Sequence, residues 1–135
     1  MASSELICVD YKKVSEVWPF VSHFIKRAAE RGDLCTFEEI EQLVLDEYAL
    51  LWIGWEAPYI VGAGVTRIVR TEKSKACVIV AWGGNDRSKW LHLIEKVEAY
   101  ARSEKCDCVR IMGRKGWQRV LKHYTAPKVL LERRF

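Results

Sequence analysis

A pair of glycines at the end of an apolar run is the part of this sequence best suited to chemistry. Gly83 and Gly84 close the apolar run 75–82 and lead, through a short polar stretch, into an amphipathic pattern. Where a strand ends in glycines before a helix, the backbone can approach an anion closely, and the unpaired first N–H groups of the helix point toward it. We therefore expect the amides of residues 83–89 to hold a pyrophosphate, with Arg87 and Lys89 adding positive charge.

The same pattern also fits an ordinary glycine turn before a capped helix. In that interpretation Asp86 or Ser88 is the helix cap, because both residue types accept hydrogen bonds from the first amides of a helix. The segment lacks the G-x-x-x-x-G-K-[ST] of a P-loop and the G-x-G-x-x-G of a dinucleotide fingerprint. Anion binding and simple capping therefore both stay open.

The positive charge of the chain is concentrated in the half that contains these glycines. Residues 1–70 carry 7 Lys/Arg and 11 Asp/Glu, whereas residues 71–135 carry 15 Lys/Arg and 7 Asp/Glu. A basic half suits an anionic ligand, either a nucleotide-bearing cofactor or nucleic acid, although it can also be a solvated surface. Because the chain shows no RNP, KH or helix-turn-helix pattern, we do not expect a nucleic-acid partner.

The helices and strands predicted around the glycines form a mixed α/β fold in one domain, residues 1–135. Strands are predicted at residues 6–10, 49–55, 59–70, 75–82, 108–112 and 128–134. Helices are predicted at residues 15–31, 36–46 and 116–124, with one long helix between Ser88 and Glu104. Pro19 is tolerated only in a first turn, which sets the start near Ser15. Thr36 and Glu39 form a capping box.

The strand pattern predicts a mainly antiparallel sheet with one parallel crossover. Short links join the three runs from 49 to 82, as in an antiparallel meander, and the strand–helix–strand unit that follows implies parallel pairing. These runs are apolar on both faces, so we expect helices to cover both sides of the sheet.

Composition limits the other kinds of site. The five cysteines are odd in number and follow no secretory signal, so we expect free thiols, a cytoplasmic location and no metal site. No apolar run approaches the length needed to span a bilayer, so we expect no membrane partner. Of the six tryptophans, Trp82 and Trp90 bracket the glycines and could pack in the core, stack on an adenine or line an acyl pocket.

The element order resembles the GNAT superfamily of N-acetyltransferases, and most closely the small GNAT-like proteins of bacteriophages. The resemblance covers nearly the whole chain and is strongest in VIVAWGGNDRSKWLHLIEKVEAYARSEKCDCVRIMGRKGWQRVLKHY. It implies that the fourth strand splays from the fifth, and that the pantetheine arm of an acyl-CoA lies in the gap and pairs with the fourth-strand backbone. The implied cofactor-binding residues are Val80, Ala81, Trp82, Gly83, Gly84, Asn85, Arg87, Ser88 and Lys89.

The sequence differs from the usual family pattern in three places. The family loop is commonly Q/R-x-x-G-x-G/A, whereas here the glycines come early and Asp86 places a negative charge near the phosphate. Many members carry a tyrosine that protonates the CoA thiolate; Tyr124 is the local candidate for this catalytic acid, about one turn late. Many members also end in a two-strand hairpin, and the one strand predicted here would leave a wall to be supplied by a second subunit of a homodimer.

Two functions are compatible with this sequence. The first is acetyl transfer from acetyl-CoA to an amine on a small molecule or protein, with acyl-CoA as co-substrate. The second is a GNAT-like structural or regulatory protein, such as a phage protein, that has lost catalysis. The three departures favour the second, and the strand–glycine–helix unit within this element order favours the first.

Overall fold

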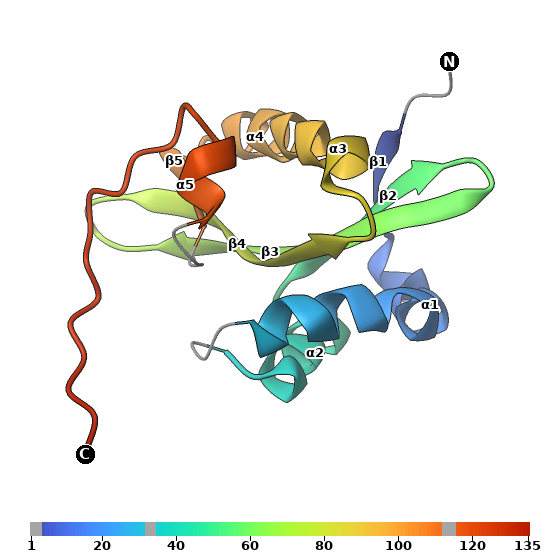
Figure 1. Ribbon diagram of the computed structural model, residues 1–135, viewed down its shortest axis with the longest axis horizontal. Helices are drawn as coiled ribbons and strands as arrows, with labels where there is room; N and C mark the ends of the chain where they lie inside the picture. The colour runs from blue at the N-terminus through green and yellow to red at the C-terminus, as the bar shows by residue number, and fades with distance from the viewer. Residues whose placement is uncertain (1–3, 32–34, 112–115) are drawn as a thin grey trace.

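A five-stranded sheet between two layers of helices forms the body of the computed structural model (Figure 1), which describes residues 4–31, 35–111 and 116–135. Its strands lie in chain order: β1 Glu5–Cys8, β2 Leu50–Glu56, β3 Tyr59–Arg70, β4 Lys75–Gly84 and β5 Cys108–Ile111. The first four pair antiparallel and β5 pairs parallel with β4. The predicted meander and parallel crossover are therefore confirmed, and Met112, the predicted last residue of the fifth strand, lies outside the described residues.

Helices cover both faces of the sheet, as its two-sided apolar pattern predicted. One face carries α1 Tyr11–Glu30 and α2 Phe37–Leu45. The other carries α3 Arg87–Trp90, the 3₁₀ turn η1 Leu91–Leu93, α4 Ile94–Ser103 and α5 Gly116–Val120 (Figure 1). Each face has its own buried apolar cluster, and the sheet separates the two.

Helix α1 begins four residues earlier than predicted, so Pro19 lies inside it and not in its first turn. The Asp10 carboxylate accepts a hydrogen bond from Lys12 N at 3.0 Å and caps the helix. Val14 and Trp18, in the first two turns, are buried against the sheet. A helix cap and two buried side chains together outweigh the one backbone hydrogen bond that proline removes.

The predicted cap of α2 is confirmed, and a side-chain contact joins α2 to α1. Thr36 Oγ1 accepts a hydrogen bond from Glu39 N at 3.1 Å. The indole of Trp18 donates from Nε1 to Glu41 Oε2 at 2.7 Å. This contact gives the buried indole N–H of Trp18 an acceptor and fixes the spacing of the two helices on their face of the sheet.

The helix predicted to be continuous from Ser88 is interrupted after one turn. At Trp90 the backbone turns to φ −128°, a 3₁₀ turn follows, and regular α-helix resumes at Ile94. The Trp90 side chain is 5% exposed and lies on the sheet at this break. We attribute the interruption to this tertiary contact, which the amphipathic spacing of the sequence does not reveal.

The C-terminal part of the prediction was wrong in two respects. The last helix ends at Val120 and not at Tyr124, and residues 128–134 form no strand. A strand requires a partner, and this segment leaves the sheet instead (Figure 1). The β-prone Val129-Leu130-Leu131 run therefore stays outside the sheet despite its composition.

Replacing Gly64 should destabilise the fold, because this position on β3 lies directly beneath an indole. A Cβ on Gly64 would overlap the six-membered ring of Trp82, whereas a Cβ on Gly54 would meet the movable Leu93 Cδ1 at 3.0 Å. Overpacking of this kind costs about 1–3 kcal/mol. We expect Gly64→Ala to lose about 2 kcal/mol in urea unfolding, and the matched variant Gly54→Ala to lose clearly less. Equal losses would contradict the packing described here.

Candidate functional site

Strand β4 continues beyond its last described pair with β5. The β4–β5 pairs run from Ala76–Cys108 to Ile79–Ile111. Strand β4 itself extends to Gly84, and the part after Ile79 still pairs with β3 on its other side. In the described part of the chain, the β4 edge from residue 80 to residue 84 has no strand beside it.

A β-bulge lies on β4 directly after the last described β4–β5 pair. Val65 on β3 faces Ala81 and the next residue, Thr66, faces Ile79, so Val80 is an extra residue on β4. Such a bulge bends the strand and increases its twist. The bulge follows directly after the last described β4–β5 pair, Ile79–Ile111.

Hydrogen-bond alternation shows which backbone groups face the open edge. Asn85 N donates to Val61 O at 3.2 Å, which continues the antiparallel ladder between β3 and β4. Residues at alternate positions of such a ladder direct their N–H and C=O groups to opposite sides. The groups of Gly83 therefore face β3, and those of Trp82 and Gly84 face the open side. This edge can pair with an extended ligand that carries amides.

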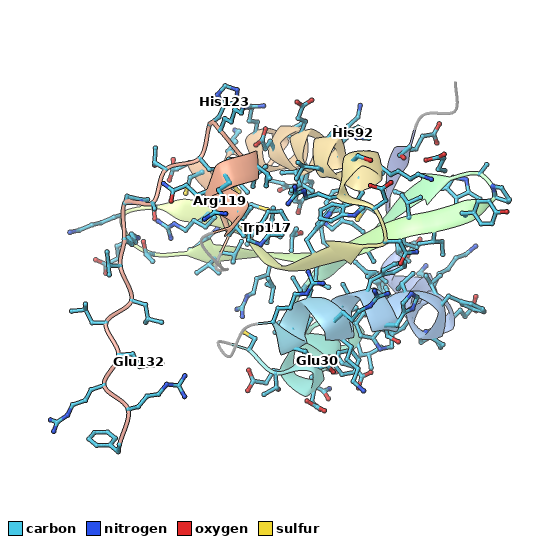
Figure 2. The ribbon with its side chains drawn as sticks, viewed as in Figure 1. Glu30, His92, Trp117, Arg119, His123 and Glu132 are labelled. Carbon is cyan, nitrogen blue, oxygen red and sulfur yellow. The ribbon has the colours of Figure 1, made fainter. Side chains whose placement is uncertain are left out.

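Three tryptophans form a wall beside this edge. The rings of Trp82 and Trp90 lie 6.3 Å apart between centroids, and Trp117 of α5 packs edge-on against Trp90 at 6.1 Å. Figure 2 shows Trp117 beneath α5, on the face of the sheet that carries α4. The sequence interpretation had Trp82 and Trp90 flanking the glycines, and the structure adds Trp117, which no local pattern connects to them.

Two donors in this aromatic wall lack acceptors in the described part of the chain. The indole Nε1 atoms of Trp82 and Trp90 are buried and make no hydrogen bond, although each side chain is only 5% exposed. A buried donor without a partner costs about 1–3 kcal/mol. The open edge of β4 is therefore bordered by groups that an oxygen-bearing ligand could satisfy if an indole turned toward it.

Packing alone explains why both residues of the glycine pair lack side chains. A Cβ at Gly83 would lie 2.8 Å from the carbonyl oxygen of Phe24 in α1. A Cβ at Gly84 would overlap Nε1 of Trp90 on the opposite face. The glycines allow α1 and an indole to approach the strand, so their presence is not by itself evidence of a phosphate site.

The capping interpretation of the loop is confirmed, with Asp86 as the cap. The Asp86 carboxylate accepts hydrogen bonds from Ser88 Oγ at 2.7 Å and from Ser88 N at 3.1 Å. These two bonds, with a smaller contribution from the charge of Lys89, lower the pKa of Asp86 below its usual value. An anion at this loop would have to compete with a carboxylate for the Ser88 amide.

Positive side chains nevertheless lie beside the loop that joins β4 to α3. Arg87 and Lys89 are exposed on α3, and Arg27 reaches across from α1, with its Nη2 3.5 Å from Asn85 Oδ1. The sequence interpretation missed Arg27, because it lies 58 residues from Asn85 and follows no motif. The structure therefore brings cations from two elements to the residues that were predicted to bind a pyrophosphate.

Tyr124 lies against Glu98 of α4 in a partly buried contact that engages its hydroxyl. It donates to Glu98 Oε2 at 2.6 Å. Burial, then the hydrogen bond and charge of Glu98, raise the pKa of Tyr124 above its usual value. A tyrosine held in this way is a weaker acid than a free one. Its role as the catalytic acid stays a prediction.

Other reactive groups in the described residues do not gather at this edge. All five cysteines are free, and burial raises the pKa of the Cys77 thiol to about 11, with a smaller contribution from Cys106. Among the described residues, no three His, Cys, Asp or Glu side chains are grouped as a metal site would require, and no helix is long and apolar enough to cross a membrane.

Two surface hollows lie toward the other end of the sheet. One of about 380 Å³ is lined by the turn 70–75 and by Glu104, Lys105 and Asp107. The other, about 220 Å³, is lined in part by Tyr48, Arg67 and Tyr100. Neither includes a residue of the predicted cofactor segment.

Several solved structures, among them three acetyltransferases, are similar to this fold. The ribosomal-protein-alanine N-acetyltransferase of Brucella melitensis biovar Abortus 2308 matches with a TM-score of 0.68 at 14% identity, over 98% of this chain and 99% of that one. An aminoglycoside acetyltransferase from an uncultured soil metagenomic sample matches with a TM-score of 0.70 at 10% identity, over 98% and 95%. Glucosamine-6-phosphate N-acetyltransferase from Arabidopsis thaliana matches with a TM-score of 0.68 at 12% identity, over 98% and 99%.

These matches establish the fold, which is the GNAT fold that the sequence resembled. No protein-family model and no curated protein sequence matches the chain. The likeness extends over nearly the full length of each neighbour and of this chain.

The pKa of Tyr124 should fall when the charge of Glu98 is removed. A carboxylate that accepts the phenol hydrogen bond favours the neutral phenol, whereas the amide of Glu98→Gln can accept the bond without the charge. We expect phenolate absorption to show Tyr124 titrating at lower pH in Glu98→Gln. Glu95→Gln, an exposed change on the same helix, should leave Tyr124 unaffected.

The same linkage predicts a pH dependence of stability. A raised folded-state pKa stabilises the protein fully below the unfolded-state value of about 10, and this stabilisation is lost as pH rises above it. The free energy of unfolding should thus decline less steeply above pH 10 in Glu98→Gln than in the wild type. Burial, and then the charge of Glu104, raise the pKa of Tyr100 to about 12. Tyr100 should contribute equally to the alkaline slope of both proteins and so serves as an internal reference. Identical alkaline slopes would show that the Tyr124–Glu98 contact does not persist in solution.

Proposed function

We propose that this chain is an acyl-CoA-dependent N-acyltransferase that binds acetyl-CoA along the open edge of β4 and transfers the acetyl group to an amine. The observation that carries the proposal is the bulged strand β4, whose edge beyond Ile79 has no β5 partner in the described residues. It is supported by the fold that the chain shares with acetyltransferases over nearly its whole length.

The backbone of β4 would hold the pantetheine arm as an added strand. Its amides would pair with the outward N–H and C=O groups of Trp82 and Gly84, and main-chain pairing of this kind gives affinity without depending on side-chain identity. The arm would lie against the wall of Trp82, Trp90 and Trp117. A turn of either unpartnered indole would let it donate to a ligand carbonyl.

The loop after β4 would hold the pyrophosphate. Arg87 and Lys89 would supply charge from α3, and Arg27 would supply it from α1. The Ser88 amide, now bonded to Asp86, would be released to the ligand as that carboxylate moved aside. Because Asp86 must give up this bond, the loop would bind pyrophosphate less tightly than a glycine-rich loop that has no acidic residue.

Transfer would proceed by direct attack of the neutral amine on the thioester carbonyl. The C–N bond forms, the C–S bond breaks, the amine nitrogen loses a proton, and the CoA thiolate gains one. The β4 edge would contribute by positioning the thioester and by polarising its carbonyl with an outward N–H. For Tyr124 to protonate the thiolate, its hydroxyl would have to leave Glu98.

The acceptor is an amine on a small molecule or on a protein. Ribosomal-protein alanine, aminoglycosides and glucosamine 6-phosphate, named for the three similar structures, are chemically unlike one another and do not select one class. We further propose that the reaction takes place in the cytoplasm without a metal ion.

A second function, a GNAT-like structural or regulatory module without catalysis, is favoured by specific contacts. Asp86 occupies the Ser88 amide, and Glu98 holds the Tyr124 hydroxyl. Both contacts are formed between groups of the chain itself. Under this alternative the β4 edge and its indoles are structural features only, and acetyl-CoA does not bind.

Titration calorimetry with acetyl-CoA distinguishes the two functions. The acyltransferase proposal predicts saturable heat, and it predicts that Arg87→Glu with Lys89→Glu weakens binding at least tenfold by reversing two charges beside the pyrophosphate. Reversal of two exposed lysines at the start of α1, Lys12→Glu with Lys13→Glu, is the matched control and should leave affinity unchanged. Absence of heat at millimolar acetyl-CoA would rule out the enzyme.

The variant Asp86→Asn tests whether the charge of Asp86 weakens acetyl-CoA binding. Asparagine is as good a helix cap as aspartate but carries no charge to repel phosphate. We expect this variant to bind acetyl-CoA several-fold more tightly than the wild type. An unchanged affinity would place the pyrophosphate away from this loop.

A further inference from the structure

Strand β3 is longer than β2, and its last residues have a strand on one side only. The β2–β3 pairs end at Leu50–Thr66, whereas β3 continues to Arg70 and pairs with β4 as far as Lys75. Figure 1 shows the turn between β3 and β4 at the end of the sheet away from the loop that follows β4. In the part of the chain that the structure describes, no strand lies on the β2 side of residues 67–70.

The backbone groups that face this open edge are those of Ile68 and Arg70. Thr71 N donates to Ser74 O at 2.8 Å across the turn, so the groups of Thr71 face β4. Alternate residues of an antiparallel ladder direct their groups to opposite sides. The groups of Val69 therefore also face β4, and those of Ile68 and Arg70 face away from it. An unpaired edge of this kind is a template for another strand.

A surface hollow of about 220 Å³ borders the open edge. The loop between α2 and β2 lines it with Tyr48, strand β3 lines it with Arg67 and Ile68, and α4 lines it with Tyr100. Tyr48 is 72% exposed, whereas Tyr100 is half-buried and packs edge-on against Trp52 with 5.3 Å between ring centroids. The hollow thus sets two aromatic rings beside a strand edge that can form main-chain hydrogen bonds.

The charges along this edge favour an acidic partner. Arg67 and Arg70 are exposed, and neither forms an ion pair with another described residue. One acidic residue, Glu47, also lines the hollow, so the two arginines leave an excess of positive charge. A second copy that paired antiparallel about Ile68 and Val69 would set Arg67 opposite Arg70, and like charges in this position destabilise a strand pair. The edge is therefore suited to a different chain that carries carboxylates.

We propose that residues 67–70 of β3 bind an extended acidic peptide segment of a partner protein as an added strand. In an antiparallel arrangement, acidic residues of the peptide would lie opposite Arg67 and Arg70, and β-prone residues would lie opposite Ile68 and Val69. Main-chain pairing with Ile68 and Arg70 would provide affinity, and the cross-strand charge pairs would select the partner.

This peptide site is separate from the proposed acyl-CoA site. It lies on β3 beyond Thr66, whereas the open edge of β4 begins at Val80 and runs toward the opposite end of the sheet. The inference therefore does not depend on the acyltransferase function.

Titration of the ¹⁵N-labelled full chain with a defined peptide tests the proposal. The probe is a hexapeptide of sequence SETIES with blocked ends, which sets its two glutamates opposite Arg67 and Arg70. We expect saturable shifts and protection from solvent exchange at the amides of Ile68 and Arg70, with much smaller changes at Val69, whose amide faces β4. Absence of saturable shifts at millimolar peptide would overturn the proposal.

Charge reversal tests the chemistry of the partner. The double variant Arg67→Glu with Arg70→Glu should bind SETIES at least tenfold more weakly and should instead bind the basic peptide SKTIKS, which the wild type should not. Lys12→Glu with Lys13→Glu, which reverses two exposed charges on α1, should leave the affinity for SETIES unchanged. Equal affinity of the wild type for the acidic and basic peptides would contradict an acidic partner.

Methylation of single peptide amides tests the strand pairing itself. The isoleucine of SETIES lies opposite Ile68, so its N–H points to β3, whereas the N–H of the neighbouring threonine points away. N-methylation of the isoleucine should abolish binding, and N-methylation of the threonine should reduce it much less. Equal losses from the two methylations would show that the peptide does not bind as an added strand.

Discussion

Val80 has no partner on β3, because Val65 pairs with Ala81 and Thr66 pairs with Ile79. This one extra residue reverses which face of the sheet the following side chains occupy. Ile79 packs beneath α4, Ala81 packs toward α1, and Trp82 returns to the α4 face. The position of the Trp82 indole on the α4 face and the direction of the backbone groups that follow both depend on the bulge.

The glycines around the bulge have a packing role that the sequence interpretation did not separate from a ligand role. Gly64 and Gly84 make room for the indoles of Trp82 and Trp90, and Gly83 lets α1 approach β4. These contacts place two indole N–H groups in the protein interior, where neither has an acceptor among the described residues. The packing that explains the glycines thus also creates the unmet hydrogen-bonding capacity beside the proposed pantetheine site.

The parts of the fold that could be predicted from sequence were those governed by local pattern. Alternating and continuous apolar runs located the meander, and the Thr36 cap was read from its motif. The wrong predictions lie where tertiary contacts override the local pattern. Burial of Trp18 accompanies the earlier start of α1, which places Pro19 inside the helix, and burial of Trp90 accompanies the break in the helix predicted from Ser88. The β-prone run after Pro127 pairs with no strand in the part of the chain that the structure describes.

The candidate site was predictable in place but not in detail. The strand–glycine–helix pattern predicted where the site lies. The sequence offered Asp86 or Ser88 as the helix cap, and the structure shows that Asp86 is the cap. The bulge could not be foreseen, because a register shift exists only between two paired strands. Arg27 and the Glu98 contact of Tyr124 join segments distant in sequence, so no local signal announced either one.

The central claim, that the open β4 edge accepts the pantetheine arm, can be tested directly by following backbone amides in ¹⁵N-labelled protein during acetyl-CoA addition. The account predicts that the amides of Trp82 and Gly84 shift and become protected from exchange with solvent, while those of Ala81 and Gly83, which face β3, change little. The indole N–H signals of Trp82 and Trp90 would report in the same spectrum on whether either gains an acceptor. Saturable binding that leaves the Trp82 and Gly84 amides unperturbed would contradict the account.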